Sequence, residues 1–213
     1  MQALMTVFIT SVAQPLFPAM AQGRFKNDDY NNIKNLLIVF GSLSGCAYFA
    51  ISIIVKLFIT KYIGSLEIIG IYFAVFPALA VINCLYINLY KIKGLMRKYI
   101  STLIFILMIA IILNIMFICI IGDFKGVAIA TTITYYIWLI IGFRQFEFLK
   151  LKLIDIIYLL LYIIGFFVIT RSMSDYVGFL VYFIFIFVLA SLCYRKQLTL
   201  CINKWLYKEK TIA

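Results

Sequence analysis

The sequence contains no histidine, and only 13% of its 213 residues are charged. Without an imidazole, a Ser-His-Asp triad and a zinc site with histidine ligands are both excluded. Acidic residues are scarce, 8 against 19 lysines and arginines, and none lies in the middle of a long apolar run. We therefore predict no catalytic residue, no metal site and no cofactor, and a protein that is not an enzyme.

The five cysteines show no motif either. They stand singly in or beside apolar runs, without a CxxC pair, at Cys46, Cys84, Cys119, Cys193 and Cys201. We interpret them as small buried apolar residues rather than as disulfide partners or metal ligands.

Apolar residues are abundant. They make up 66% of the chain, and the mean hydropathy is +1.11. A soluble domain is nearer to about half apolar and about a quarter charged, and a chain of this size has too little interior to hide so much apolar surface. The fold class predicted is therefore all-α, a polytopic membrane helix bundle. Because the basic residues lie between the apolar runs, we expect contact with membrane lipids and no nucleic-acid partner.

The apolar runs predict about seven transmembrane helices plus a C-terminal amphipathic helix. The predicted spans are residues 1–20, 36–59, 68–90, 100–121, 127–143, 156–170 and 177–194. Residues 1–195 would form the transmembrane bundle. Residues 196–213 would form a basic amphipathic tail on the cytoplasmic face, with its apolar positions at Leu198, Cys201, Ile202, Trp205 and Leu206.

The basic residues indicate how the spans are oriented. All but four of the 19 lysines and arginines fall on one side of the predicted spans, and the four exceptions are Lys56, Lys61, Lys125 and Arg171. Because cytoplasmic loops are enriched in Lys and Arg, we predict a cytoplasmic C-terminus and an N-terminus on the other side. In this scheme Lys34 closes a polar loop, residues 23–34, and every cation lies in a loop or at the end of a span.

The short break at residues 122–126 predicts a tight turn between two spans. The second of these spans begins with small residues, and Gly126 and Ala130 lie one helical turn apart. Small residues let helices approach closely in a bilayer, so we predict that both lie on a packing face.

Four amide side chains are the candidates for lining a cavity or binding a substrate: Gln14, Asn83, Asn88 and Asn114. All four lie within the predicted spans. The amides suit two roles, hydrogen bonding between helices or lining a polar path, and the sequence leaves both open.

Three segments, by their motifs and by their order and spacing along the chain, resemble polysaccharide (O-antigen) flippases of the multidrug/oligosaccharidyl-lipid/polysaccharide exporter superfamily. QPLFPAMA at residues 14–21, followed by a charged loop, resembles the LFPxxA-type helix end of that family. GDFKGVAIAT at residues 122–131, with Asn114 upstream, resembles its GxxxGAAIAT-like turn, although Val127 stands where an alanine is common. KIKGLMRKY at residues 91–99 fits the basic end of the third span.

The resemblance implies a transporter of the bacterial inner membrane that moves lipid-linked oligosaccharide for surface polysaccharide synthesis, such as O-antigen of lipopolysaccharide. Members of the family have two pseudo-symmetric bundles around a central cavity. Because the similarity covers only the second, C-terminal bundle, we expect a truncated or split reading frame that works with a missing N-terminal half or as a homodimer. The alternatives are a multidrug-type exporter, a membrane-embedded glycan polymerase and an inactive truncated remnant.

Overall fold

The computed structural model describes residues 11, 16–23 and 25–209, and these residues form helices and connecting turns without a strand. The predicted all-α class is confirmed. Within the described residues, five helices are long and apolar enough to cross a membrane, or six if one bent pair is counted as a single span. These six correspond in order to the predicted spans from residue 36 onward. Most of the first predicted span, including Gln14, lies outside the described residues.

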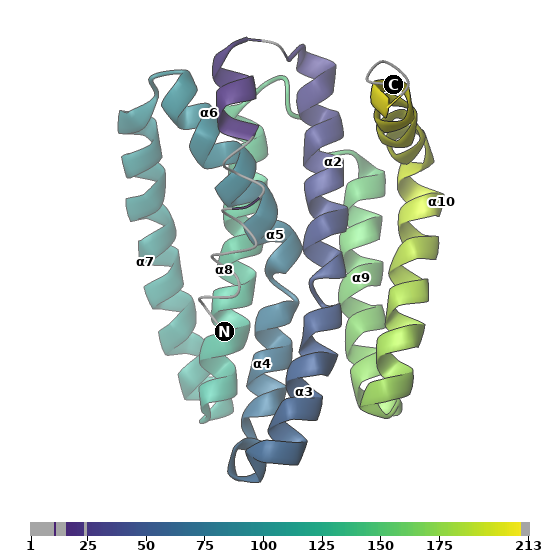
Figure 1. Cartoon of the computed structure of the whole chain (residues 1–213). Helices are drawn as coiled ribbons and strands as arrows, with labels where there is room; N and C mark the ends of the chain where they lie inside the picture. The colour runs from purple at the N-terminus through teal and green to yellow at the C-terminus, as the bar shows by residue number, and fades with distance from the viewer. Residues whose placement is uncertain (1–10, 12–15, 24, 210–213) are drawn as a thin grey trace.

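Two of the six spans are broken. The first comprises α2 (Asn27–Leu43) and α3 (Cys46–Phe58), and the second follows the short helix η1 (Thr60–Tyr62). The second comprises α4 (Ser65–Phe73), α5 (Phe76–Val81), the π-helical segment η2 (Ile82–Tyr86) and α6 (Ile87–Ile92). The remaining four are α7 (Met96–Ile121), α8 (Phe124–Gln145), α9 (Leu153–Ser172) and α10 (Asp175–Glu209). Successive spans run in opposite directions along the bundle (Figure 1).

The up-and-down arrangement separates the charges along the bundle. The turn between α6 and α7, the start of α2 and the loop of residues 146–152 all lie at one end, here called the basic end (Figure 1). The turns α3–α4, α7–α8 and α9–α10 lie at the other, here called the opposite end, which carries Lys56, Lys61, Lys125 and Arg171. Which end faces the cytoplasm stays a prediction.

The broken spans pack on each other where proline interrupts the helix. Pro77 lies in the first turn of α5, and the two halves of this span are bent by 46°. Gly41 of α2 faces this bend so closely that an added Cβ would stand 2.5 Å from the Pro77 Cα and 2.8 Å from the Phe76 carbonyl oxygen. Absence of a side chain at Gly41 therefore allows α2 and α5 to pack backbone to backbone.

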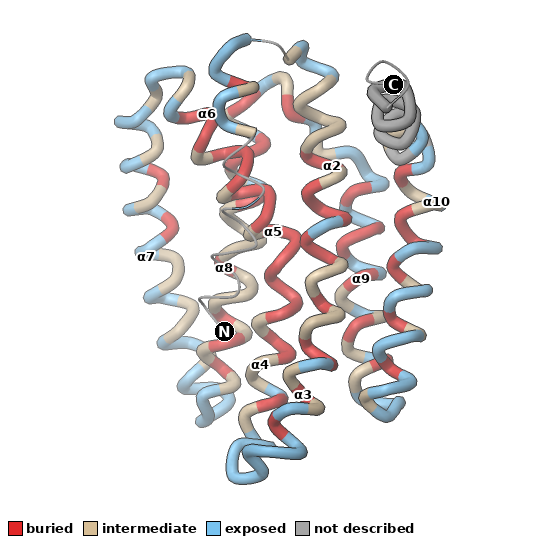
Figure 2. The backbone as a smooth tube through the Cα atoms, in the orientation of Figure 1, coloured by how far each residue is buried: buried red, intermediate tan, exposed pale blue. Residues whose placement is uncertain are grey.

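Helix α7 lies at the edge of the bundle and is the most exposed span. Only 6% of its most apolar stretch is buried, and its neighbours are α8 and α6 (Figure 2). It ends at Gly122, whose φ of 69° is the left-handed conformation that commonly stops a helix. Gly126 of α8 packs on the Phe117 carbonyl of α7, and Ala130 is fully buried. The predicted packing face is confirmed.

The C-terminal segment remains helical beyond the last span. Helix α10 continues to Glu209 across a break at Tyr194, where φ is −125° and ψ is 28°. The break comes just before the predicted start of the tail at residue 196, and it separates the apolar span from a basic helix.

Candidate functional site

A polar cavity of about 790 Å³ opens at the basic end of the bundle. Helix α2 forms one wall, and the α8–α9 loop (residues 146–152) forms another. Lys93 follows the last residue of α6, and Gln197 lies in α10 just after its break at Tyr194. Amides and lysines dominate its lining, which consists of Asn27, Asp28, Asn31, Asn32, Lys34, Asn35, Lys93, Glu147, Phe148, Lys150, Lys152 and Gln197.

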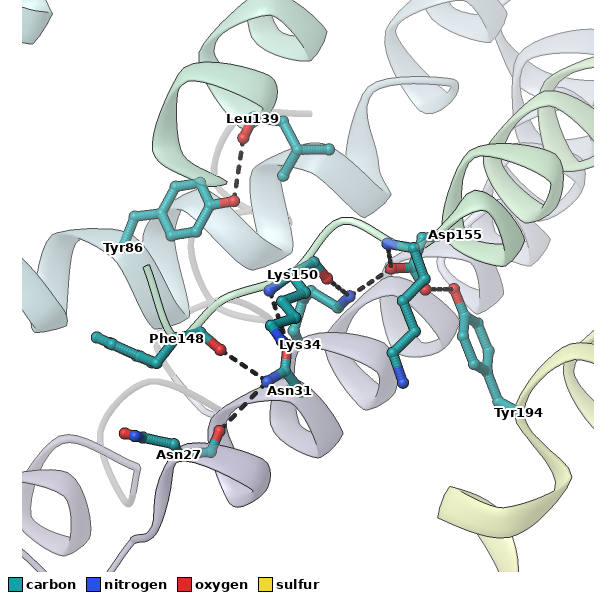
Figure 3. Close-up of polar contacts among 10 residues, drawn as sticks. Asn27, Asn31, Lys34, Tyr86, Leu139, Phe148, Lys150, Asp155 and Tyr194 are labelled. Carbon is teal, nitrogen blue, oxygen red and sulfur yellow. Dashed lines mark hydrogen bonds and ion pairs between the residues drawn. The ribbon is translucent and has the colours of Figure 1, made fainter. Parts of the chain in front are cut away.

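A fully buried ion pair lies at the inner wall of this cavity. The Lys34 ammonium of α2 contacts the Asp155 carboxylate of α9, and both side chains are inaccessible to solvent. The carboxylate also accepts from the Lys152 backbone N–H and the Tyr194 hydroxyl, each at 2.9 Å (Figure 3). Three donors on one carboxylate offset much of the cost of removing its charge from water. The cluster joins α2, α9 and α10.

Asn31 holds the α8–α9 loop one turn before Lys34. Its Nδ2 donates to the Phe148 carbonyl at 2.8 Å, and its Oδ1 accepts from the Lys150 backbone N–H at 3.0 Å (Figure 3). Lys34 adds a bond from Nζ to the Lys150 carbonyl at 2.8 Å. Helix α2 therefore fixes the backbone of the loop through two side chains and shapes one wall of the cavity.

Two helices that reach this region begin in the same way. Lys26 precedes the first residue of α2, and its backbone N–H donates to the Asp29 carboxylate at 2.9 Å. Lys152 precedes the first residue of α9, and its backbone N–H donates to the Asp155 carboxylate at 2.9 Å. A carboxylate in the first turn satisfies a free N–H and complements the helix dipole. Asp155 thus stabilises the start of α9 and also neutralises Lys34.

The sequence-based assignment of Lys34 needs correction. Lys34 was placed in a polar loop, but helix α2 begins at Asn27, so Lys34 lies inside the helix and points into the bundle. Asp155 lies in the first turn of α9, at the edge of the span, and its side chain is completely buried. The prediction that every cation lies in a loop or at a span end is therefore wrong for Lys34. The sequence KNDD at residues 26–29 is typical of a helix start and could have indicated that the helix begins before Lys34.

Two other side chains of the cavity, Asn35 and Lys93, have polar groups that are available to a ligand. Asn35 is 3% exposed, yet its Oδ1 has no hydrogen-bond partner among the described residues. The Lys93 ammonium lies 4.0 Å from the centre of the Phe148 ring, and its side chain is exposed. A buried acceptor without a donor and an accessible ammonium beside an aromatic face are groups that a polar ligand can satisfy.

The opposite end is organised around exposed ion pairs. Lys56 of α3 pairs with Asp175 at the start of α10 at 2.6 Å, and Ser52 donates to the same carboxylate at 2.9 Å. Glu67 of α4 lies 2.7 Å from the Lys125 ammonium and 3.8 Å from the Arg171 guanidinium. Two cavities of about 430 and 470 Å³ both include Glu67 and Arg171 in their lining.

The four predicted candidates do not form a common site in the part of the chain that the structure describes. Asn88 donates to the Cys84 carbonyl of its own helix at 2.9 Å. Asn83 is in η2, and Asn114 is on α7, where its Oδ1 is buried without a described partner. None of these three lines the cavities at either end, and Gln14 is outside the described residues. The amides of the cavity, which sequence reasoning missed, come instead from the NDDYNNIKN segment at the start of α2.

No protein-family model matches the chain, and no curated protein and no solved structure is significantly similar to it. The candidate site therefore stands on its own geometry.

Proposed function

We propose that the protein is a membrane transport protein, or part of one, that carries a lipid-linked oligosaccharide across the bacterial inner membrane, as the flippases that its sequence resembles do. The observation that carries this proposal is the polar cavity at the basic end. A membrane bundle that only packs against lipid has no need of a cavity of about 790 Å³ lined by amides and lysines.

The lining suits a ligand of this chemistry. Side-chain amides can donate to and accept from sugar hydroxyls, and lysines bind phosphate as point charges. Phe148 offers an aromatic face beside Lys93. The lysines outnumber the acidic residues in the lining, so the cavity favours an anionic or neutral polar ligand over a cation.

The alternatives fit these features less well. A drug exporter that takes up cations requires acidic and aromatic groups in its cavity, whereas lysines and amides prevail here. A glycan polymerase requires a large loop with catalytic polar residues outside the membrane. The connections at the opposite end are short, and α7 and α8 are separated only by Gly122 and Asp123. A partner bundle would supply further walls of the transport route.

The test uses the free acceptor of Asn35. We reconstitute the chain, alone and with candidate partner bundles, into proteoliposomes and measure translocation of a fluorescent polyprenyl-diphosphate-linked oligosaccharide. Asn35→Leu is expected to lower the rate at least about tenfold because it removes a hydrogen bond to substrate. It is expected to leave the detergent melting temperature unchanged or raised, since it also removes a buried acceptor without a donor.

A matched pair of lysines controls for charge. Lys93→Gln is expected to slow translocation, whereas Lys91→Gln, two residues away, exposed and outside the cavity, is expected to have no effect. If Asn35→Leu and Lys93→Gln both transport at the rate of the unmodified protein, the cavity does not handle the substrate and the proposal fails.

A further inference from the structure

The two cavities whose linings share Glu67 and Arg171 differ in charge. The cavity of about 470 Å³ contains Lys56 and Arg171 together with Glu67 and Asp175, so its charges balance. The cavity of about 430 Å³, here called the α8–α9 groove, contains Lys125 and Arg171 but only one carboxylate. Its lining consists of Glu67, Ile71, Ala74, Ile121, Lys125, Ile129, Thr132, Ile133, Ile163, Phe167 and Arg171.

The charged groups of the α8–α9 groove lie at its mouth. Glu67 and Lys125 are in the first turns of α4 and α8, and Arg171 is in the last turn of α9, so three helix ends meet there. Glu67 takes up one of the two positive charges. Arg171 is 75% exposed and approaches Glu67 only to 3.8 Å. Its guanidinium therefore has donors to offer to an additional anion.

Below its mouth the groove is apolar. Ile129 and Ile133 line it from α8, and Ile163 and Phe167 line it from α9. The hydroxyl of Thr132, the polar side chain at this depth, already donates to the Ala128 carbonyl of its own helix at 2.9 Å. From Lys125 to Ile133 the helix rises about 12 Å, so the groove extends from the interfacial level well into the hydrocarbon level.

We propose that the α8–α9 groove binds one anionic phospholipid, with its phosphate on Lys125 and Arg171 and one acyl chain along the isoleucines below. The groove joins one excess positive charge to an aliphatic wall, and a phospholipid of one net negative charge complements both. A free anion would use the mouth but leave the apolar wall empty. An uncharged lipid would use the wall but leave the two cations of the lining with a single carboxylate between them.

The binding test uses the purified full chain in detergent and three probes with one part of the lipid varied at a time. Native mass spectrometry is expected to show one phosphatidylglycerol retained per chain. Diacylglycerol with the same acyl chains is expected to bind at least about tenfold more weakly, because the charge-assisted hydrogen bonds to phosphate are lost. Inorganic phosphate is expected neither to displace the lipid nor to reproduce its effect on thermal stability.

Two substitutions locate the binding. Lys125→Gln and Arg171→Gln are each expected to weaken retention of phosphatidylglycerol about tenfold or more, since each removes one charge-assisted contact. Lys61→Gln is the control because Lys61 is an exposed lysine of the same end that does not line the groove. Retention that is equal in all three variants, or diacylglycerol bound as tightly as phosphatidylglycerol, would overturn the proposal. Displacement by phosphate alone would show a simple anion site and would overturn it too.

A second measurement needs no substitution and so does not depend on how the variants fold. The unmodified chain is placed in phosphatidylcholine nanodiscs with a trace of phosphatidylglycerol that carries a photoreactive group in its acyl chain. A bound lipid is expected to label α8 and α9 near Ile133 and Ile163. Lipid that merely surrounds the bundle would label chiefly α7, the most exposed span. Labelling that follows exposure alone contradicts the proposal.

Discussion

The buried pair of Lys34 and Asp155 makes a quantitative prediction about stability. In the variant Asp155→Asn, the Lys34 ammonium is left as a buried charge without a counter-charge. In Lys34→Met, the carboxylate keeps two of its three donors but loses its cation. Breaking a buried pair by removing one partner costs about 3–5 kcal/mol, so we expect each single variant to lose that much free energy of unfolding.

The double variant measures the interaction energy between Lys34 and Asp155. If the two residues acted independently, the loss would be about 6–10 kcal/mol. With both charges removed, the amide at position 155 can accept from the Lys152 N–H through its single oxygen and donate from its Nδ2 to the Tyr194 hydroxyl oxygen, so no charge remains buried. We expect the double variant to be no less stable than either single variant, which corresponds to a coupling energy of at least about 3 kcal/mol.

Unfolding free energies are measured by titrating sodium dodecyl sulfate into maltoside micelles and following the helical circular dichroism. The exposed pair Lys56–Asp175, with side chains 46% and 16% exposed, provides the matched control. Lys56→Met and Asp175→Asn are expected to couple by no more than about 1 kcal/mol. A coupling energy for Lys34 and Asp155 as small as that of the control pair would refute a buried, mutually neutralising pair.

Two remaining predictions concern packing and orientation. Gly41→Ala is expected to lower the free energy of unfolding by about 1–3 kcal/mol because the new methyl group meets the backbone at Pro77. Gly64→Ala, where an added Cβ has no atom within 4 Å, should change it by less than about 0.5 kcal/mol, and equal losses at both sites would contradict close packing. Reporter fusions after Lys98 and after Lys61 are expected to report opposite sides of the membrane, the first cytoplasmic. Equal activity of one reporter at both positions would show that the orientation is wrong.

The sequence predicted the helical class and the order of the spans well because both follow from composition. Long apolar runs separated by basic turns leave few alternatives once the bilayer is the solvent. Close packing at Gly126 and Ala130 could also be predicted, because a small side chain lets a neighbouring helix approach at that position. The structure adds that α2 and α5 pack backbone to backbone where Gly41 faces the break near Pro77.

The cavity could not be predicted in this way because its walls come from distant parts of the chain. Asn31 and Lys150 are 119 residues apart in the sequence, and they meet only because α2 packs beside the loop that follows α8. Polar residues near a span end look alike whether they face water or the interior of the bundle. The amides of the apolar runs were therefore favoured over those of the α2 start, where the cavity lies.

The two ends of the bundle are closed by interactions of different strength. At the basic end, α2, α9 and α10 are joined through a buried carboxylate with three donors, and separating them leaves charges unpaired in a dry interior. At the opposite end, the pairs of Lys56, Lys125 and Arg171 are exposed, and each contributes about 0–1 kcal/mol because water can replace the partner. Breaking the ion pairs of the opposite end therefore costs much less than breaking the pair that joins α2 to α9. Access to the cavity at the basic end should accordingly depend on the exposed side chains at its rim, such as Lys93, while the Lys34–Asp155 cluster stays closed.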